Sequence, residues 1–111
     1  MNRQAVLTSL IQFSETVTRL KVALESFPWD VDNSIITLAK RDVIAILERF
    51  VVGEFDANAL EEWANLVECR EDIEFEPDHA QVISDAIFQL ANPTLCGPLL
   101  IKAPEIISSL R

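Results

Sequence analysis

The spacing of apolar residues in the first quarter of the chain is typical of an α-helix. Large apolar side chains recur at intervals of four and three residues, at Val6, Leu10, Phe13, Val17, Leu20 and Leu24. This spacing places them on one side of a helix. It predicts a long amphipathic helix from about Asn2 to Glu25, ended by Pro28, with Trp29 packed back on the core.

Two similar stripes predict the next two helices. The inward residues of the second helix are Val43, Ile46, Leu47 and Phe50. Ser34 or Thr37 could cap the start of this helix, and Gly53 is placed just past its end. The third helix is predicted to run from an N-cap at Asp56 to about Arg70. Its inward residues are Leu60, Trp63, Ala64 and Val67.

A fourth helix is predicted after Pro77, which suits the first helical position, with Asp78 near the positive end of the helix dipole. Its inward residues are Ala80, Ile83, Ile87 and Leu90. Asn92 and Pro93 are expected to stop it. The remaining tail is interrupted by glycine and proline, and this predicts an irregular packed stretch with a short last helix from Pro104.

One short segment, EDIEFE at residues 71–76, alternates between acidic and apolar residues as a strand would. No other segment is an obvious partner for a strand, so we expect an extended connection with one acidic and one apolar side. The sequence therefore predicts an all-α fold, a single-domain bundle of four to five amphipathic helices that spans residues 1–111.

The chain shows few residues for catalysis or for a metal site. It has one histidine, two cysteines and no CxxC or HExxH pair, and its two glycines are isolated. A Cys69–His79 nucleophile pair lacks an orienting third residue. Cys69 and Cys96 are expected to be free, partly buried thiols, and His79 an exposed polar residue. We therefore predict no enzyme activity, no catalytic residue, no metal and no cofactor.

Charge is the most informative feature for function. The net charge is −9, yet residues 54–85 contain eleven acids and one base, whereas the rest of the chain has seven acids and eight bases. Such a surface repels nucleic acid and attracts basic proteins. The apolar stretches are too short to span a bilayer, and the N-terminus is unlike a signal peptide, so we expect a cytoplasmic protein that binds neither nucleic acid nor membrane directly.

The acidic segment is the candidate binding site for a basic partner. Charged residues around an aromatic centre are common in tight protein interfaces, and Ile73 and Phe75 lie among the acids. Phe75 is the candidate anchor. The predicted contact residues are Glu54, Asp56, Glu61, Glu62, Glu68, Glu71, Asp72, Glu74, Phe75, Glu76 and Asp78.

Residues 43–77 also resemble a known group of proteins. The relevant features are the LERF helix end, the Gly53–Glu54 step, the Glu62–Asn65 run EWAN and the Arg70–Ile73 turn REDI. In these features the segment is similar to the small acidic immunity proteins of bacterial contact-dependent growth inhibition and related polymorphic toxin systems. The resemblance covers about a third of the chain.

The resemblance implies an all-α protein that binds the C-terminal toxin domain of a large secreted effector in a one-to-one heterodimer. Such toxins are commonly nucleases, whose basic residues hold phosphates. A ribonuclease is favoured over a DNase. A pore-forming toxin is disfavoured, since its immunity protein would lie in the membrane. The toxin would be neutralised by covering its basic active-site cleft with the acidic surface.

Three alternatives stay open at the level of the sequence. An acidic adaptor or secretion chaperone would bind a basic or amphipathic client segment, and a long exposed hydrophobic groove and a homodimer would favour it. A small enzyme or regulator would have a deep pocket holding Cys69 or His79. A structural or regulatory bundle would have no dedicated toxin, and its acidic face would serve only solubility.

Overall fold

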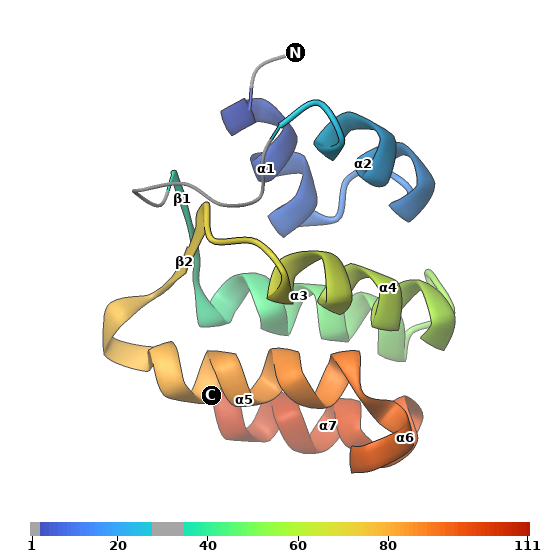
Figure 1. Cartoon of the computed structure of the whole chain (residues 1–111). Helices are drawn as coiled ribbons and strands as arrows, with labels where there is room; N and C mark the ends of the chain where they lie inside the picture. The colour runs from blue at the N-terminus through green and yellow to red at the C-terminus, as the bar shows by residue number, and fades with distance from the viewer. Residues whose placement is uncertain (1–2, 28–34) are drawn as a thin grey trace.

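The computed structural model describes residues 3–27 and 35–111. Figure 1 shows three layers of helices, with a small sheet at one end of the middle layer. The top layer contains α1 (Arg3–Gln12) and α2 (Val17–Leu24), the middle layer α3 (Lys40–Val51) and α4 (Ala57–Glu68), and the bottom layer α5 (Ala80–Ala91), α6 (Pro93–Cys96) and α7 (Leu99–Leu110). The predictions for Pro28, Trp29 and Ser34 lie outside the described residues.

The predicted long first helix is wrong, because the chain turns between α1 and α2. Phe13 adopts a positive φ of 48°, and Thr16 caps α2 by accepting a hydrogen bond from the Arg19 backbone N–H at 3.3 Å. Arg49 of α3 donates to the Gln12 and Phe13 carbonyls at 2.9 and 3.2 Å. These carbonyls belong to the end of α1, so a cation from a distant helix caps it. The apolar stripe continues through the turn, and all six of its residues are buried.

A two-stranded parallel sheet corrects the prediction of a purely helical fold. Strands β1 (Ile36–Leu38) and β2 (Ile73–Phe75) pair with Ile36 opposite Ile73 and Leu38 opposite Phe75. The predicted partnerless connection therefore has a partner, and Thr37 lies in β1 instead of capping a helix. The cap of α3 is formed by Asp42, whose carboxylate accepts from the Ala39 backbone N–H at 2.9 Å. The fold is mostly helical but not all-α.

The predictions around α4 are confirmed. Gly53 follows α3 with a φ of 89°, which glycine adopts without steric cost. Asp56 caps α4 by accepting from the Ala59 backbone N–H at 2.8 Å. The four inward residues of α4 are fully or almost fully buried, and the Trp63 indole N–H donates to the Leu10 carbonyl at 2.7 Å. This bond joins the middle layer to the top layer.

The C-terminal third departs from the prediction in two places. Pro77 begins a short 3-10 helix, η1 (Pro77–His79), and α5 starts only at Ala80, which is half-buried. As predicted, α5 ends before Asn92. Helix α7 begins at Leu99, so the expected helix start at Pro104 is wrong. A proline inside a helix costs about 3 kcal/mol, whereas burying one Leu or Ile side chain yields about 1.5–3 kcal/mol. The buried residues of α7 outweigh the proline; they are Leu99, Ala103, Ile106, Ile107 and Leu110.

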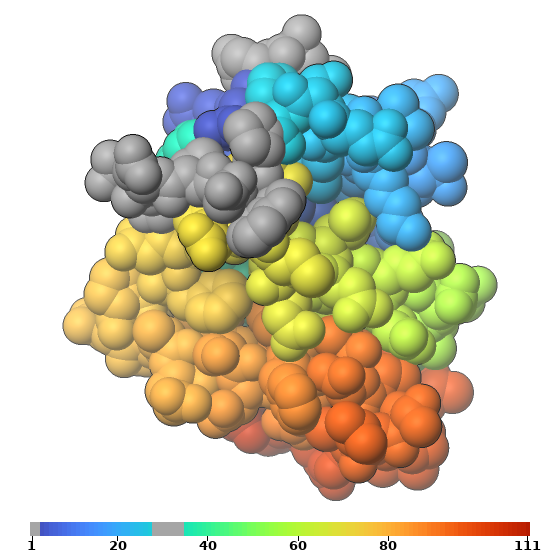
Figure 2. Space-filling model, viewed as in Figure 1, coloured from blue at the N-terminus to red at the C-terminus, as the bar shows by residue number. Residues whose placement is uncertain are grey.

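The layers form one compact domain with a Cα radius of gyration of 13.2 Å, as expected for a chain of this length. Helix α4 packs mainly against α5, and α3 mainly against α7. As a result α4 presents its outer side between α2 and α5 on the face shown in Figure 2. Among the described residues, no helix is both long and apolar enough to cross a bilayer.

Candidate functional site

The predicted contact residues fall into two groups in the structure. Members of one group make hydrogen bonds or core contacts within the fold, whereas the other group consists of the half-buried Glu61 and Glu62 and three exposed acids. The first group contains Glu54, Asp56, Asp72, Glu74, Phe75 and Glu76, and the second contains Glu61, Glu62, Glu68, Glu71 and Asp78.

Asp72 is the clearest member of the bound group, because its side chain has no exposed surface. Both of its carboxylate oxygens accept from the Arg70 guanidinium at 2.9 Å, and Arg3 of α1 lies 3.9 Å away. Its backbone carbonyl accepts from the N–H groups of Ile35, just before β1, and Ile36, the first residue of β1. A buried carboxylate cannot contact a docked partner, so the assignment of Asp72 to the binding surface is wrong.

The acids of β2 and its flank also serve the fold. Glu74 lies beside Thr37 across the sheet at 3.5 Å, and Glu76 accepts from the Lys40 backbone N–H at 3.3 Å at the start of α3. Ile73 is buried, and Phe75 is half-buried against the core. Phe75 therefore packs part of its surface on the core and keeps part of it accessible, and its role as an anchor stays a prediction.

Glu54 and Asp56 hold the corner before α4. Glu54 accepts from Arg49 at 2.6 Å, and Arg49 lies over the Phe13 and Phe55 rings, with its guanidinium carbon 5.8 and 5.4 Å from their centroids. Asp56 is the N-cap of α4. Both carboxylates are exposed, but each already accepts a hydrogen bond within the fold.

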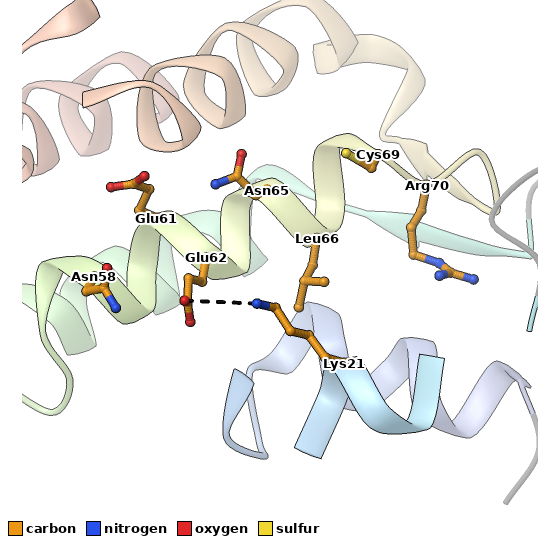
Figure 3. Close-up of a pocket in the computed structure, with 8 residues that line it drawn as sticks. All are labelled: Lys21, Asn58, Glu61, Glu62, Asn65, Leu66, Cys69 and Arg70. Atoms are coloured by element: carbon orange, nitrogen blue, oxygen red, sulfur yellow. Dashed lines mark ion pairs between the residues drawn. The ribbon is translucent and has the colours of Figure 1, made fainter. Parts of the chain in front are cut away.

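Two half-buried acids of α4, Glu61 and Glu62, border an open groove of about 950 Å³ between α2 and α4, drawn in Figure 3. From α4, Glu62 and Leu66 point toward α2, whereas Glu61 and Asn65 point away from it. The groove is lined by Lys21, Asn58, Glu61, Glu62, Asn65, Leu66, Cys69 and Arg70.

The two cations of the groove are unequally available. Arg70 is only 8% exposed and directs its guanidinium to Asp72. Lys21 of α2 is 50% exposed and lies 4.0 Å from Glu62, at the limit of an ion pair. An exposed pair of this kind contributes little to stability. A cation from a partner could replace Lys21 beside Glu62 at small cost, and Glu61 adds a second carboxylate on the far side of α4.

Leu66 is the functional candidate that sequence analysis missed. It lies one position outside the buried stripe of α4, next to Val67, so it is partly buried against the core and partly open to the groove. Its position at the edge of the stripe could have indicated this, since such residues lie where the apolar and polar sides of a helix meet. The contribution of Lys21 could not be found from the sequence, because it depends on how α2 packs.

The side chains of the groove are suited to binding a partner more than to catalysis. Both cysteines are free; Cys96 is half-buried as predicted, whereas Cys69, at the end of the groove, is exposed. His79 is half-buried in η1 instead of exposed. Within residues 3–27 and 35–111, no group of three or more His, Cys, Asp or Glu side chains is placed to hold a metal ion. Carboxylates, amides and one leucine are suited to binding a basic protein surface.

Comparison with known proteins adds no relative. The chain matches no protein-family model, no curated protein and no solved structure.

Proposed function

We propose that this protein is an immunity protein, which binds and neutralises a basic toxin domain through the outer side of α4. The observation that carries the proposal is the pair of groove-lining carboxylates, Glu61 and Glu62, around an apolar side chain in the α2–α4 groove. Glu61 and Glu62 line the groove, and Glu68 and Glu71 are exposed beside it. Leu66 supplies the apolar contact within the groove.

The charge distribution supports a basic partner. Even after the carboxylates that serve the fold are set aside, Glu61, Glu62 and Glu68 lie on α4 and Glu71 follows its end. The negative charge of this surface raises the rate of encounter with a basic partner, and it repels acidic competitors such as nucleic acid. The resemblance of residues 43–77 to immunity proteins of growth-inhibition systems agrees with this proposal.

The expected target is the C-terminal domain of a secreted nuclease toxin, with a ribonuclease favoured. A nuclease cleft holds phosphates with Lys and Arg. The carboxylates of α4 would take the positions of those phosphates, and Leu66 would pack on an apolar part of the cleft. The substrate would then be excluded by competition in a one-to-one complex.

The first test is co-expression with the reading frame immediately upstream. The proposal expects the C-terminal domain of a large exoprotein to co-purify and to kill cells only when this protein is absent. Purification of both chains without a stable complex, or killing that this protein does not prevent, would contradict the proposal.

The second test maps the surface with two charge-matched variants. The first replaces Glu61, Glu62, Glu68 and Glu71 by Gln, and the control replaces Glu15, Glu25, Glu48 and Glu105 by Gln. Both change the net charge from −9 to −5. The α4 variant is expected to slow association with the toxin domain at least about tenfold at low salt, and the control by less than about threefold. Stopped-flow association rates measure both, and equal slowing would contradict the α4 site.

The second candidate function is an acidic adaptor or secretion chaperone. The observation that favours it is the set of exposed apolar residues on α7 and at the end of α3, which include Leu100 at 72% exposure and Val52, just past α3, at 75%. An adaptor would bind an extended or helical client segment with no toxic activity. Protection from killing in the co-expression test separates it from the immunity function.

A further inference from the structure

Helix α7 is apolar on two sides, although only one side is buried in the core. The outward side carries Leu100, Ile101 and Pro104, with exposures of 72% and 61% for the first two. Because these residues are three or four positions apart from Pro104, they lie together on one side of the helix. Exposed apolar side chains that lie together on one side of a helix can mark an interaction surface.

The neighbouring end of α3 extends this apolar surface. Val51 and Val52 are 50% and 75% exposed, and they line a groove of about 390 Å³ together with Pro104, Ile107 and Ser108 of α7. We call the surface formed by Val51, Val52, Leu100, Ile101 and Pro104 the α3–α7 face. It lies across the molecule from the outer side of α4, since α3 and α7 are behind α4 and α5 in Figure 1.

The charged residues at the border of the α3–α7 face neutralise each other. Arg111 donates to Glu48 at 3.0 Å, and Lys102 lies 3.4 Å from Glu105. The face therefore has no surplus of either sign, in a protein whose net charge is −9. A basic partner would gain no electrostatic attraction there and would prefer the acidic α4 side.

We propose that the α3–α7 face binds a second copy of this chain in a two-fold symmetric dimer. Two copies repel each other through their acidic surfaces, so they approach best where the charge is balanced and the surface is apolar. In a two-fold arrangement Ile101 of each copy would pack near the α3–α7 groove of the other. The acidic side of α4 stays free, so the dimer does not depend on the proposed function.

The size of the face sets the expected strength. The face takes in only the first half of α7 and the C-terminal end of α3, so its area lies at the small end of specific interfaces. We expect a dissociation constant of about 1–100 µM. The dimer should tighten as salt rises from about 50 to about 500 mM, because screening weakens the repulsion between two acidic chains. Binding to a basic toxin should weaken over the same range.

Sedimentation equilibrium of the purified full chain tests the proposal. The wild type should approach twice the monomer mass of 12.5 kDa at concentrations of several hundred µM. Ile101→Glu should raise the dissociation constant at least about tenfold, since it places a carboxylate in each half of the contact. Val22→Glu is the matched control: Val22 is 62% exposed on α2, away from the face, and its replacement should leave the dimer intact.

Circular dichroism checks that each variant remains folded. We expect both to fold, because Ile101 and Val22 are exposed. A wild type that stays at 12.5 kDa at every concentration would overturn the proposal. A dimer that survives Ile101→Glu, or one that Val22→Glu also disrupts, would equally overturn it. Each of these results leaves the toxin-binding tests on α4 unaffected, so the two proposals can fail separately.

Discussion

The outer side of α4 and the junction of the two strands, where Asp72 precedes β2, both contain acidic residues, but in different environments. On α4, Glu61 and Glu62 border an open groove, and the closest cation to Glu62 is an exposed lysine at 4.0 Å. At the junction, Asp72 is completely buried and bound by Arg70. Neighbours in sequence differ as strongly, since Glu71 is exposed and Asp72 is not. Acidic sequence composition therefore overstates the acidic surface.

The largest expected effect comes from removing the buried carboxylate. Asp72→Ala should lower the free energy of unfolding by about 3–5 kcal/mol, because it leaves the Arg70 guanidinium buried without its carboxylate. Glu71→Ala should change it by less than about 0.5 kcal/mol. Urea denaturation followed by circular dichroism measures both. Similar losses for the two variants would remove the distinction between junction and surface.

The same ion pair can be tested by replacing both partners. Arg70→Met combined with Asp72→Leu should recover more than half of the stability lost in Asp72→Ala, since no buried charge remains between these two positions. The remaining loss would reflect Arg3, which lies near Asp72 at 3.9 Å. A double variant as unstable as Asp72→Ala would show that the ion pair itself specifies the junction.

A smaller effect is expected at the corner before α4. Asp56→Ala should lower the free energy of unfolding by about 1 kcal/mol, because the Ala59 backbone N–H loses its acceptor. Asp78→Ala, a change of the same exposed residue type in η1, should cost less than about 0.5 kcal/mol. Thermal unfolding resolves the difference. Equal costs would indicate that Asp56 contributes through charge and not through its cap.

The smallest effect on stability is expected on α4 itself. The variant with Gln at positions 61, 62, 68 and 71 should unfold within about 1 kcal/mol of the wild type, since the one ion pair it loses is exposed and weak. The same variant should show the largest loss of toxin binding. A strong loss of stability instead would assign these acids to the fold, as at the junction.

Several parts of the fold could be predicted from the sequence because their causes are local. Gly53 and Asp56 mark a helix end and a helix start through backbone geometry that each residue favours by itself. The stripe of Leu60, Trp63 and Val67 shows which side of α4 is buried. The acidic segment likewise indicated which part of the chain carries the exposed charge.

The remaining features depend on residues that are distant in sequence. The turn after Gln12 is held by Arg49, the strand at Ile73 needs Ile36 as its partner, and α7 passes through Pro104 because its apolar side packs on α3 and α5. Whether a carboxylate is exposed was decided in the same way, because burial of Asp72 requires Arg70 and α1 beside it. Local propensity and periodicity determined which segments are helical. Only tertiary packing decided where the first helix is interrupted, which strands pair and which acids face solvent.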